Sequence, residues 1–110
     1  MKQALIAVAI VTVLLCGLLA ASAEEGLASY YNYGPVACIG MRVGPMTAAH
    51  KSLPCGSKVR VTTRSGSAVL TITDRGPYVR GRILDVSLDA ARVLGLIGPG
   101  VLPVTVERLQ

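Results

Sequence analysis

The amino-acid sequence predicts an all-β fold, a small closed barrel that carries one short helix. Five or six short segments rich in β-branched residues are separated by turns that contain Gly or Pro, whereas only one segment has the pattern of a helix. The folded part is also short, because 87 of the 110 residues remain once an N-terminal targeting segment is set aside. Many short strands in so small a domain favour a closed barrel.

Residues 1–23 have the layout of a secretory signal peptide. A positive start and an apolar run over residues 4–19 precede the cleavage motif Ala21-Ser22-Ala23. We therefore expect a mature domain of residues 24–110 that is not inserted in a membrane. A retained membrane anchor is the alternative, because the apolar run approaches the roughly 20 residues that a membrane span needs.

Two short segments of the mature domain precede its most regular strands. Leu27–Tyr31 is a β-type run that ends at the turn signal of residues 32–35, and Met46–His50 is a second short apolar run. Between them, residues 36–45 contain three Gly or Pro residues, so we expect an irregular loop there.

The middle of the chain has the clearest strand patterns. Lys58–Thr63 alternates charged and apolar residues, which predicts a half-buried strand, and Arg64–Ser67 predicts a hairpin turn. Ala68–Thr73 is the next expected strand, and its core residues are expected to be Val69, Leu70 and Ile72.

One helix and a last strand complete the expected fold. After a strand over Arg82–Val86, Ser87 is expected to be the N-cap of a helix that Gly95 ends, with Asp89 in its first turn. The last strand is expected over Leu102–Leu109. The apolar face of the helix should contain Ala90, Ala91, Val93 and Leu94.

Cysteine usage and charge limit the possible functions. The mature domain retains Cys38 and Cys55, which predict a disulfide in an oxidising compartment. With His50 as its one histidine, it has no paired ligand spacing, so we expect no metal site and no cofactor. Its ten basic and six acidic side chains give a net charge of +4, but nucleic acid is a poor partner for a secreted domain.

Carboxylates are scarce, and Asp74 and Asp85 are the two that need an explanation. The others are explained by an expected frayed N-terminus (Glu24 and Glu25), the helix start (Asp89) and an exposed strand (Glu107). Asp74 ends a strand beside the turn at Gly76-Pro77, which places a carboxylate at a rim of the barrel, although it could simply cap its own turn. This inventory favours a carboxylate-centred reaction on a sugar.

Several motifs of the mature domain occur in a fixed order: Gly26–Tyr31, Thr47–Val61, Asp74-Arg75-Gly76-Pro77-Tyr78, Ile83–Ser87 and Ala90–Gly95. These motifs resemble signatures of the rare lipoprotein A (RlpA) family. Together they extend over residues 26–109, nearly the whole mature domain, in compatible spacing. The resemblance implies a six-stranded double-psi β-barrel, the fold also found in expansins, barwin-like proteins and family 45 cellulases.

The resemblance also implies a bacterial cell-envelope enzyme, periplasmic or secreted, that cleaves peptidoglycan glycan strands poor in stem peptides. Such a lytic transglycosylase protonates the glycosidic oxygen and then takes a proton from the C6 hydroxyl of the sugar, closing a 1,6-anhydro ring without water. One carboxylate can serve both steps. Carried onto this sequence, Asp74 is the expected acid or electrostatic stabiliser, and His50 is its hydrogen-bonding or proton-relaying neighbour.

One position departs from the family pattern. Its members commonly have a Gly-Glu-Arg-aromatic motif, whereas this chain has Gly40-Met41-Arg42-Val43. Since Met41 cannot transfer a proton, either Asp74 works with His50 alone or the barrel binds glycan without cleaving it, as expansins do. A third interpretation is a barwin-like interaction or defence protein.

Four residues are expected to bind the glycan substrate. Tyr31 and Tyr78 could stack on a sugar, with core packing as the alternative. Arg75 and Arg80 would attract the lactyl carboxylates and phosphates of bacterial walls.

Asp85 is expected to be structural and to bond backbone amides. We expect the protein to act as a monomer.

Overall fold

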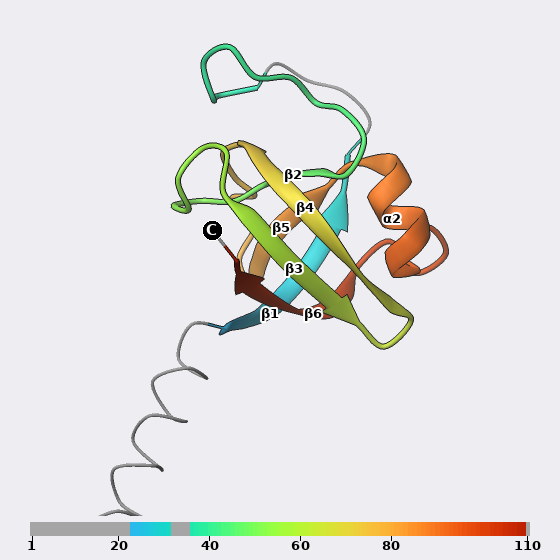
Figure 1. Cartoon of the computed structure of the whole chain (residues 1–110). Coiled ribbons are helices and arrows are strands. Elements are labelled where there is room, and N and C mark those ends of the chain that lie inside the picture. Colours follow the sequence, from blue (N-terminus) through green and yellow to red (C-terminus); the bar gives the residue numbers. More distant parts are fainter. Residues whose placement is uncertain (1–22, 32–35, 110) are drawn as a thin grey trace, which may run out of the picture.

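The structure is a computed structural model of the chain, and it describes residues 23–31 and 36–109. Within these residues, six strands form a closed barrel in the order β1-β5-β2-β4-β3-β6, and one short helix packs outside it (Figure 1). Two neighbouring pairs, β1–β5 and β2–β4, are parallel, and the other four are antiparallel. The predicted fold class is therefore confirmed. The elements are β1 (Ala23–Tyr30), β2 (Thr47–Ala49), β3 (Lys58–Thr63), β4 (Gly66–Asp74), β5 (Arg82–Val86), α2 (Leu88–Leu94) and β6 (Leu102–Arg108).

The first strand begins earlier than the sequence pattern predicts. β1 starts at Ala23 and not at Leu27, and Glu24 and Glu25 pair with Val106 and Thr105 of β6. The expected frayed N-terminus is therefore wrong, because this segment is held by a partner strand from the other end of the chain. The rest of the predicted signal peptide and the turn at residues 32–35 lie outside the described residues. In the part that the structure describes, no helix is long and apolar enough to cross a membrane.

The core of the barrel follows the alternation of β3 and β4. Val59 pairs with Leu70 across these strands, and both side chains are fully buried. Ile72 is also fully buried, so two of the three predicted core residues of β4 are confirmed. Val69 is 45% exposed, because it lies between inward-facing neighbours and pairs with exposed Arg60 on the outer face.

The helix has the predicted limits but a narrower buried face. It follows Ser87 and ends at Gly95, and Ala90, Ala91 and Leu94 are its buried residues. Val93 is 50% exposed, since steps of about 100° per residue turn it away from these three. The hydroxyl of Ser87 forms no capping bond. It donates to Asp89 (2.7 Å) and accepts the amide of Thr47 (3.2 Å) instead, which attaches the start of the helix to β2.

Asp89 also orders the chain just before β2. Its Oδ2 accepts the amide of Met46 at 2.9 Å, and Met46 has a φ of 55°, a strained conformation for a residue other than glycine. Burial acts to raise the pKa of the Asp89 carboxyl, but hydrogen bonds from the Ser87 hydroxyl and from backbone amides lower it below the ordinary value. The prediction that Asp89 lies in the first turn of the helix is thus correct. Its hydrogen bond with the amide of Met46 was not predicted.

The end of the helix provides a test of the packing. Gly95 has a φ of +75°, and a Cβ added there would lie 2.6 Å from Cβ and Oγ of Ser65 in the β3–β4 turn. We expect Gly95→Ala to lower the free energy of unfolding by at least about 1–2 kcal/mol, measured by urea denaturation. Gly98→Ala is the matched control, because a Cβ there meets no described atom within 4 Å. Equal stability of the two variants would contradict this packing.

Candidate active site at the barrel rim

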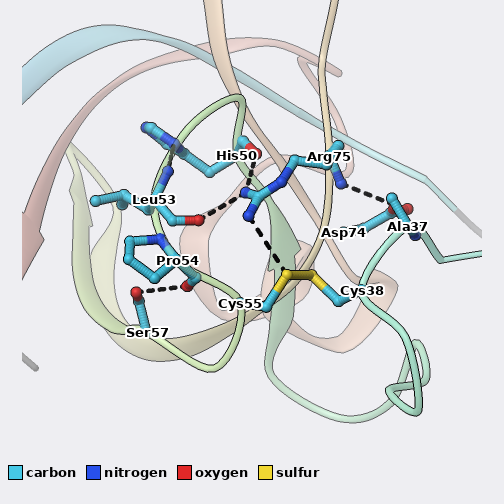
Figure 2. Close-up of a disulfide and its surroundings, with 9 residues drawn as sticks. All are labelled: Ala37, Cys38, His50, Leu53, Pro54, Cys55, Ser57, Asp74 and Arg75. Atoms are coloured by element: carbon cyan, nitrogen blue, oxygen red, sulfur yellow. Dashed lines mark hydrogen bonds between the residues drawn. A yellow bond between two sulfur atoms is a disulfide. The ribbon is translucent and has the colours of Figure 1, made fainter.

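The carboxylate of Asp74 is held at the end of β4 by two backbone amides. Its Oδ1 accepts from Ala37 at 2.6 Å and from Arg75 at 2.8 Å (Figure 2). The bond from Arg75 is a local turn cap, as one interpretation of the sequence expected. The bond from Ala37 comes from the loop that follows β1, so it also fixes the carboxylate relative to a distant segment.

The barrel places a second carboxylate near Asp74. Ala49 of β2 pairs with Asp74 of β4 on one side and with Asp85 of β5 on the other. Adjacent strands are about 4.8 Å apart, so the two α-carbons lie on the order of 10 Å from each other. Asp85 accepts the hydroxyl of Ser29 in β1. It is thus a structural acceptor, as predicted, but for a side-chain hydroxyl and not for the backbone amides.

The hydroxyl of Tyr31 is buried near the two carboxylates. Burial raises the pKa of this phenol, and the charges of Asp74 and Asp85 add to the effect. The hydroxyls of Thr47 and Thr73 act in the opposite direction, yet neither reaches hydrogen-bonding geometry with Tyr31. Among the described residues, the hydroxyls of Tyr31 and Thr73 have no hydrogen-bond partner. Burial and the two charges thus favour the protonated form of this phenol. Nothing in the strand pattern singled out Thr73.

Arg75 joins the turn after β4 to the loop after β2. Its Nη1 donates to the carbonyls of His50 (3.0 Å) and Leu53 (2.6 Å), and its Nη2 donates to Sγ of Cys55 (3.3 Å). Figure 2 shows the guanidinium between the histidine and the disulfide. Three of the five N–H donors of a guanidinium are thus used inside the protein. Substrate binding by Arg75 stays a prediction. The structure shows a second role, since these bonds hold the loop after β2 against the end of β4.

The predicted disulfide between Cys38 and Cys55 is confirmed. It connects the loop that contains Ala37 to the loop that contains Leu53, with 5.8 Å between the two cysteine α-carbons. Since Ala37 bonds Asp74 and Leu53 bonds Arg75, the disulfide cross-links the two loops that hold the end of β4.

His50 is buried beside Asp74, but its ring faces other partners. Its Nδ1 accepts the amides of Ser52 (3.1 Å) and Leu53 (3.0 Å), and its Nε2 lies 2.8 Å from Oε1 of Glu24. The hydrogen bond that joins His50 to Asp74 runs between backbone atoms, from N to O at 3.2 Å. Figure 2 shows the ring and the Asp74 carboxylate on opposite sides of Arg75. The contact with Glu24 was missed because it depends on the pairing of β1 with β6.

The turn between β4 and β5 exposes the remaining predicted binding residues. Tyr78 is 79% exposed, and Val79 and Arg80 beside it are exposed as well. An aromatic ring, an apolar side chain and a guanidinium are therefore accessible in a segment that directly follows Asp74 and Arg75. Their contact with a substrate stays a prediction.

A separate hollow of about 570 Å³ lies over β6 and the adjoining parts of β1 and β3. None of the predicted site residues lines this hollow. We therefore identify the rim as the candidate site by its carboxylates and hydrogen bonds, and not by the volume of a cavity. Among residues 23–31 and 36–109, no group of three His, Cys, Asp or Glu side chains could hold a metal ion. The hollow is lined by Glu25, Gly26, Leu27, Thr62, Thr63, Arg64, Pro103, Val104 and Thr105.

Comparisons with known proteins agree with the motifs of the rim. A family model described as lytic transglycolase matches residues 23–106. The chain is 55% identical over 95 residues to a probable endolytic peptidoglycan transglycosylase RlpA of Nostoc sp., covering 77% of this chain and 25% of that protein. It is 44% identical over 95 residues to an endolytic peptidoglycan transglycosylase RlpA of Pasteurella multocida, covering 80% and 32%. The chain therefore spans a quarter to about a third of the length of these relatives.

A solved structure shares the fold. An expansin of Clavibacter michiganensis superposes with a TM-score of 0.69 at 24% sequence identity, covering 80% of this chain and 50% of that chain. At this identity the likeness concerns the fold alone, and it agrees with the double-psi β-barrel that the sequence motifs implied.

Removal of the disulfide should loosen the rim measurably. The bond encloses 16 residues between Cys38 and Cys55, and a loop of that length contributes on the order of 3 kcal/mol in the chain-entropy model. We expect the double variant Cys38→Ser/Cys55→Ser to lose about that much unfolding free energy in urea at 25 °C. Reduction of the wild-type protein should reproduce the loss. An unchanged unfolding midpoint in both cases would contradict the prediction.

Proposed function

Because the chain belongs to the lytic transglycolase family, we propose that it cleaves peptidoglycan glycan strands as a lytic transglycosylase. Its substrate would be peptide-poor strands, cut between MurNAc and GlcNAc to leave 1,6-anhydro ends. The observation that carries the proposal is the carboxylate of Asp74, fixed at the end of β4 by the amides of Ala37 and Arg75. The names of the Nostoc and Pasteurella relatives support this substrate.

Asp74 would carry out both proton transfers. Its Oδ1 is occupied by two amides, which leaves Oδ2 as the oxygen that meets the substrate. In the first step, the Asp74 proton passes to the glycosidic oxygen while the C1–O bond of MurNAc breaks. In the second, the C6 hydroxyl attacks C1 and its proton returns to Asp74, so the 1,6-anhydro ring closes and no water is consumed. The hydroxyl of Tyr31 is buried and makes no hydrogen bond among the described residues, so we assign it no step in the reaction.

The exposed turn after β4 would bind the glycan. We assign sugar stacking to Tyr78, which is 79% exposed, and recognition of lactyl carboxylates or wall phosphates to Arg80 and Arg75. A cell-envelope location, periplasmic or secreted, fits this substrate and the predicted signal peptide. We further propose that the protein acts as a monomer.

A second candidate function is glycan binding without cleavage. Met41 favours it, because it occupies the position where the RlpA pattern has a Glu and cannot transfer a proton. The amide of Met41 donates to the carbonyl of Cys38 at 3.0 Å, within the loop that the disulfide closes. In this case the rim would retain its contacts with sugar and lose the chemistry.

One assay separates the two functions. The protein produced from the full sequence is incubated with peptide-free glycan strands, and the products are analysed by mass spectrometry. We expect new 1,6-anhydro ends, and a rate at least about 100-fold lower for Asp74→Asn, which retains an oxygen for the two amides but cannot transfer the proton.

Glu107→Gln is the control for the loss of a carboxylate, since Glu107 pairs with Arg60 on exposed surface, and it should cleave at the wild-type rate. Intact glycan that co-sediments with the protein would contradict transglycosylation and support the binding function. Cleavage by Asp74→Asn at the wild-type rate would contradict the role of Asp74.

A further inference from the structure

We infer that His50 is a positioning residue, which holds the rim loop through Nδ1 while Glu24 fixes its ring through Nε2. This replaces the proton-relaying role that the family resemblance implies. The inference deepens the proposed function and rests on it wherever activity is the readout. Its observations are the contacts of the ring, which do not depend on any substrate.

The contacts of the ring determine its protonation. Backbone amides are donors only, so the amides of Ser52 and Leu53 require an unprotonated Nδ1. A neutral imidazole with a bare Nδ1 carries its proton on Nε2. That proton points to Oε1 of Glu24, 2.8 Å away. His50 is therefore the neutral Nε2–H tautomer, with both ring nitrogens used.

This arrangement leaves no ring nitrogen for Asp74. A proton added at Nδ1 would face two N–H groups and break both of their hydrogen bonds. Nε2 is directed to Glu24 on β1, and His50 is only 5% exposed, so the ring has little freedom to turn. Within the part of the chain that the structure describes, no side-chain hydrogen bond links His50 to Asp74. A proton relay between them has no path through the ring.

The loop that His50 holds leads to Asp74 by another route. With its amides bonded to Nδ1, the segment from His50 to Leu53 directs two carbonyls at the guanidinium of Arg75. The backbone amide of Arg75 in turn donates to Oδ1 of Asp74. The ring therefore acts on the reacting carboxylate through the loop and Arg75.

Glu24 is the outer support of this arrangement. Its side chain is 48% exposed, whereas that of His50 is 6% exposed, so Glu24 links the buried ring to the surface of the barrel. A bond from the ring N–H to an ionised carboxylate is stronger than one to a neutral acceptor. Glu24 does not occupy the position of the family's Glu, which is Met41 in this chain, and it contacts His50 and not Asp74. We therefore assign Glu24 a positioning role and no role in proton transfer.

The tautomer can be measured without any substrate. His50 is the one histidine of the chain, so a nitrogen-15 spectrum of the tag-free, full-length protein contains a single imidazole. At neutral pH we expect an unprotonated Nδ1 and a protonated Nε2. In Glu24→Gln the side-chain carbonyl still accepts, so the Nε2 proton stays protected, whereas in Glu24→Ala it exchanges faster with water. A protonated Nδ1, or averaging between tautomers, would overturn the inference.

Substitutions of His50 separate positioning from proton transfer. The Oδ1 of an asparagine is bonded to Cγ, as Nδ1 is, and accepts amides two and three residues onward in Asx-type turns. His50→Asn should therefore keep the Ser52 and Leu53 amides protected from exchange and keep kcat within about tenfold of wild type, with KM unchanged. His50→Leu has no acceptor and should lose both the amide protection and the activity.

A proton-transfer role predicts the opposite result for the asparagine variant. His50→Asn would then lose about 10²–10⁴-fold in kcat, as His50→Leu does, while its amides stay protected, and this would overturn the inference. If the wild-type protein cleaves no glycan, the proposed function fails, but the tautomer and the amide protection still decide the role of His50. If His50→Leu does not fold, the asparagine variant alone decides it.

Discussion

The contact of the Arg75 guanidinium with two carbonyls of the neighbouring loop is the interaction on which the rim depends. In the residues that the structure describes, the loops before and after β2 contain no strand or helix that could fix them. They are instead joined by Arg75, by the Cys38–Cys55 disulfide and by the bond from Ala37 to Asp74. Each of these cross-links leads to the end of β4. A small domain with a modest core thus obtains an ordered carboxylate from a few polar and covalent links rather than from extensive packing.

The closed barrel explains why these links come together. β2 lies between β4 and β5, so its short register puts Asp74 and Asp85 on either side of Ala49. The pairing of β1 with β6 then brings Glu24 to the same rim, against the ring of His50. Residues far apart in the sequence meet because the sheet has no free edge. The parallel pair β2–β4 contributes as well, since both strands run to the same end of the barrel before the loop after β2 and the turn after β4 begin.

Local sequence patterns predicted most of the fold. The period-two alternation of Lys58–Thr63 identified β3 with its observed limits, and an even pair of cysteines identified the disulfide. The errors have physical reasons. Val69 is apolar but lies on the outer face of its strand, and Glu24 has no local strand signal because its partner is Val106. The family resemblance led us to expect His50 as a neighbour of Asp74, and a backbone hydrogen bond joins the two residues. Only the side-chain hydrogen bonds show where the His50 ring points.

The central claim, that loop contacts made through Arg75 hold Asp74 in place, is tested most directly by amide hydrogen exchange at Ala37. Ala37 is exposed, so burial cannot protect its amide, and its bond to Oδ1 of Asp74 is the one available source of protection among the described residues. We predict slow exchange in the wild-type protein and exchange at least about tenfold faster in Arg75→Met, since a population shift of that size needs only about 1.4 kcal/mol. Equal rates in the two proteins, or exchange at the unfolded-chain rate in the wild type, would contradict the account.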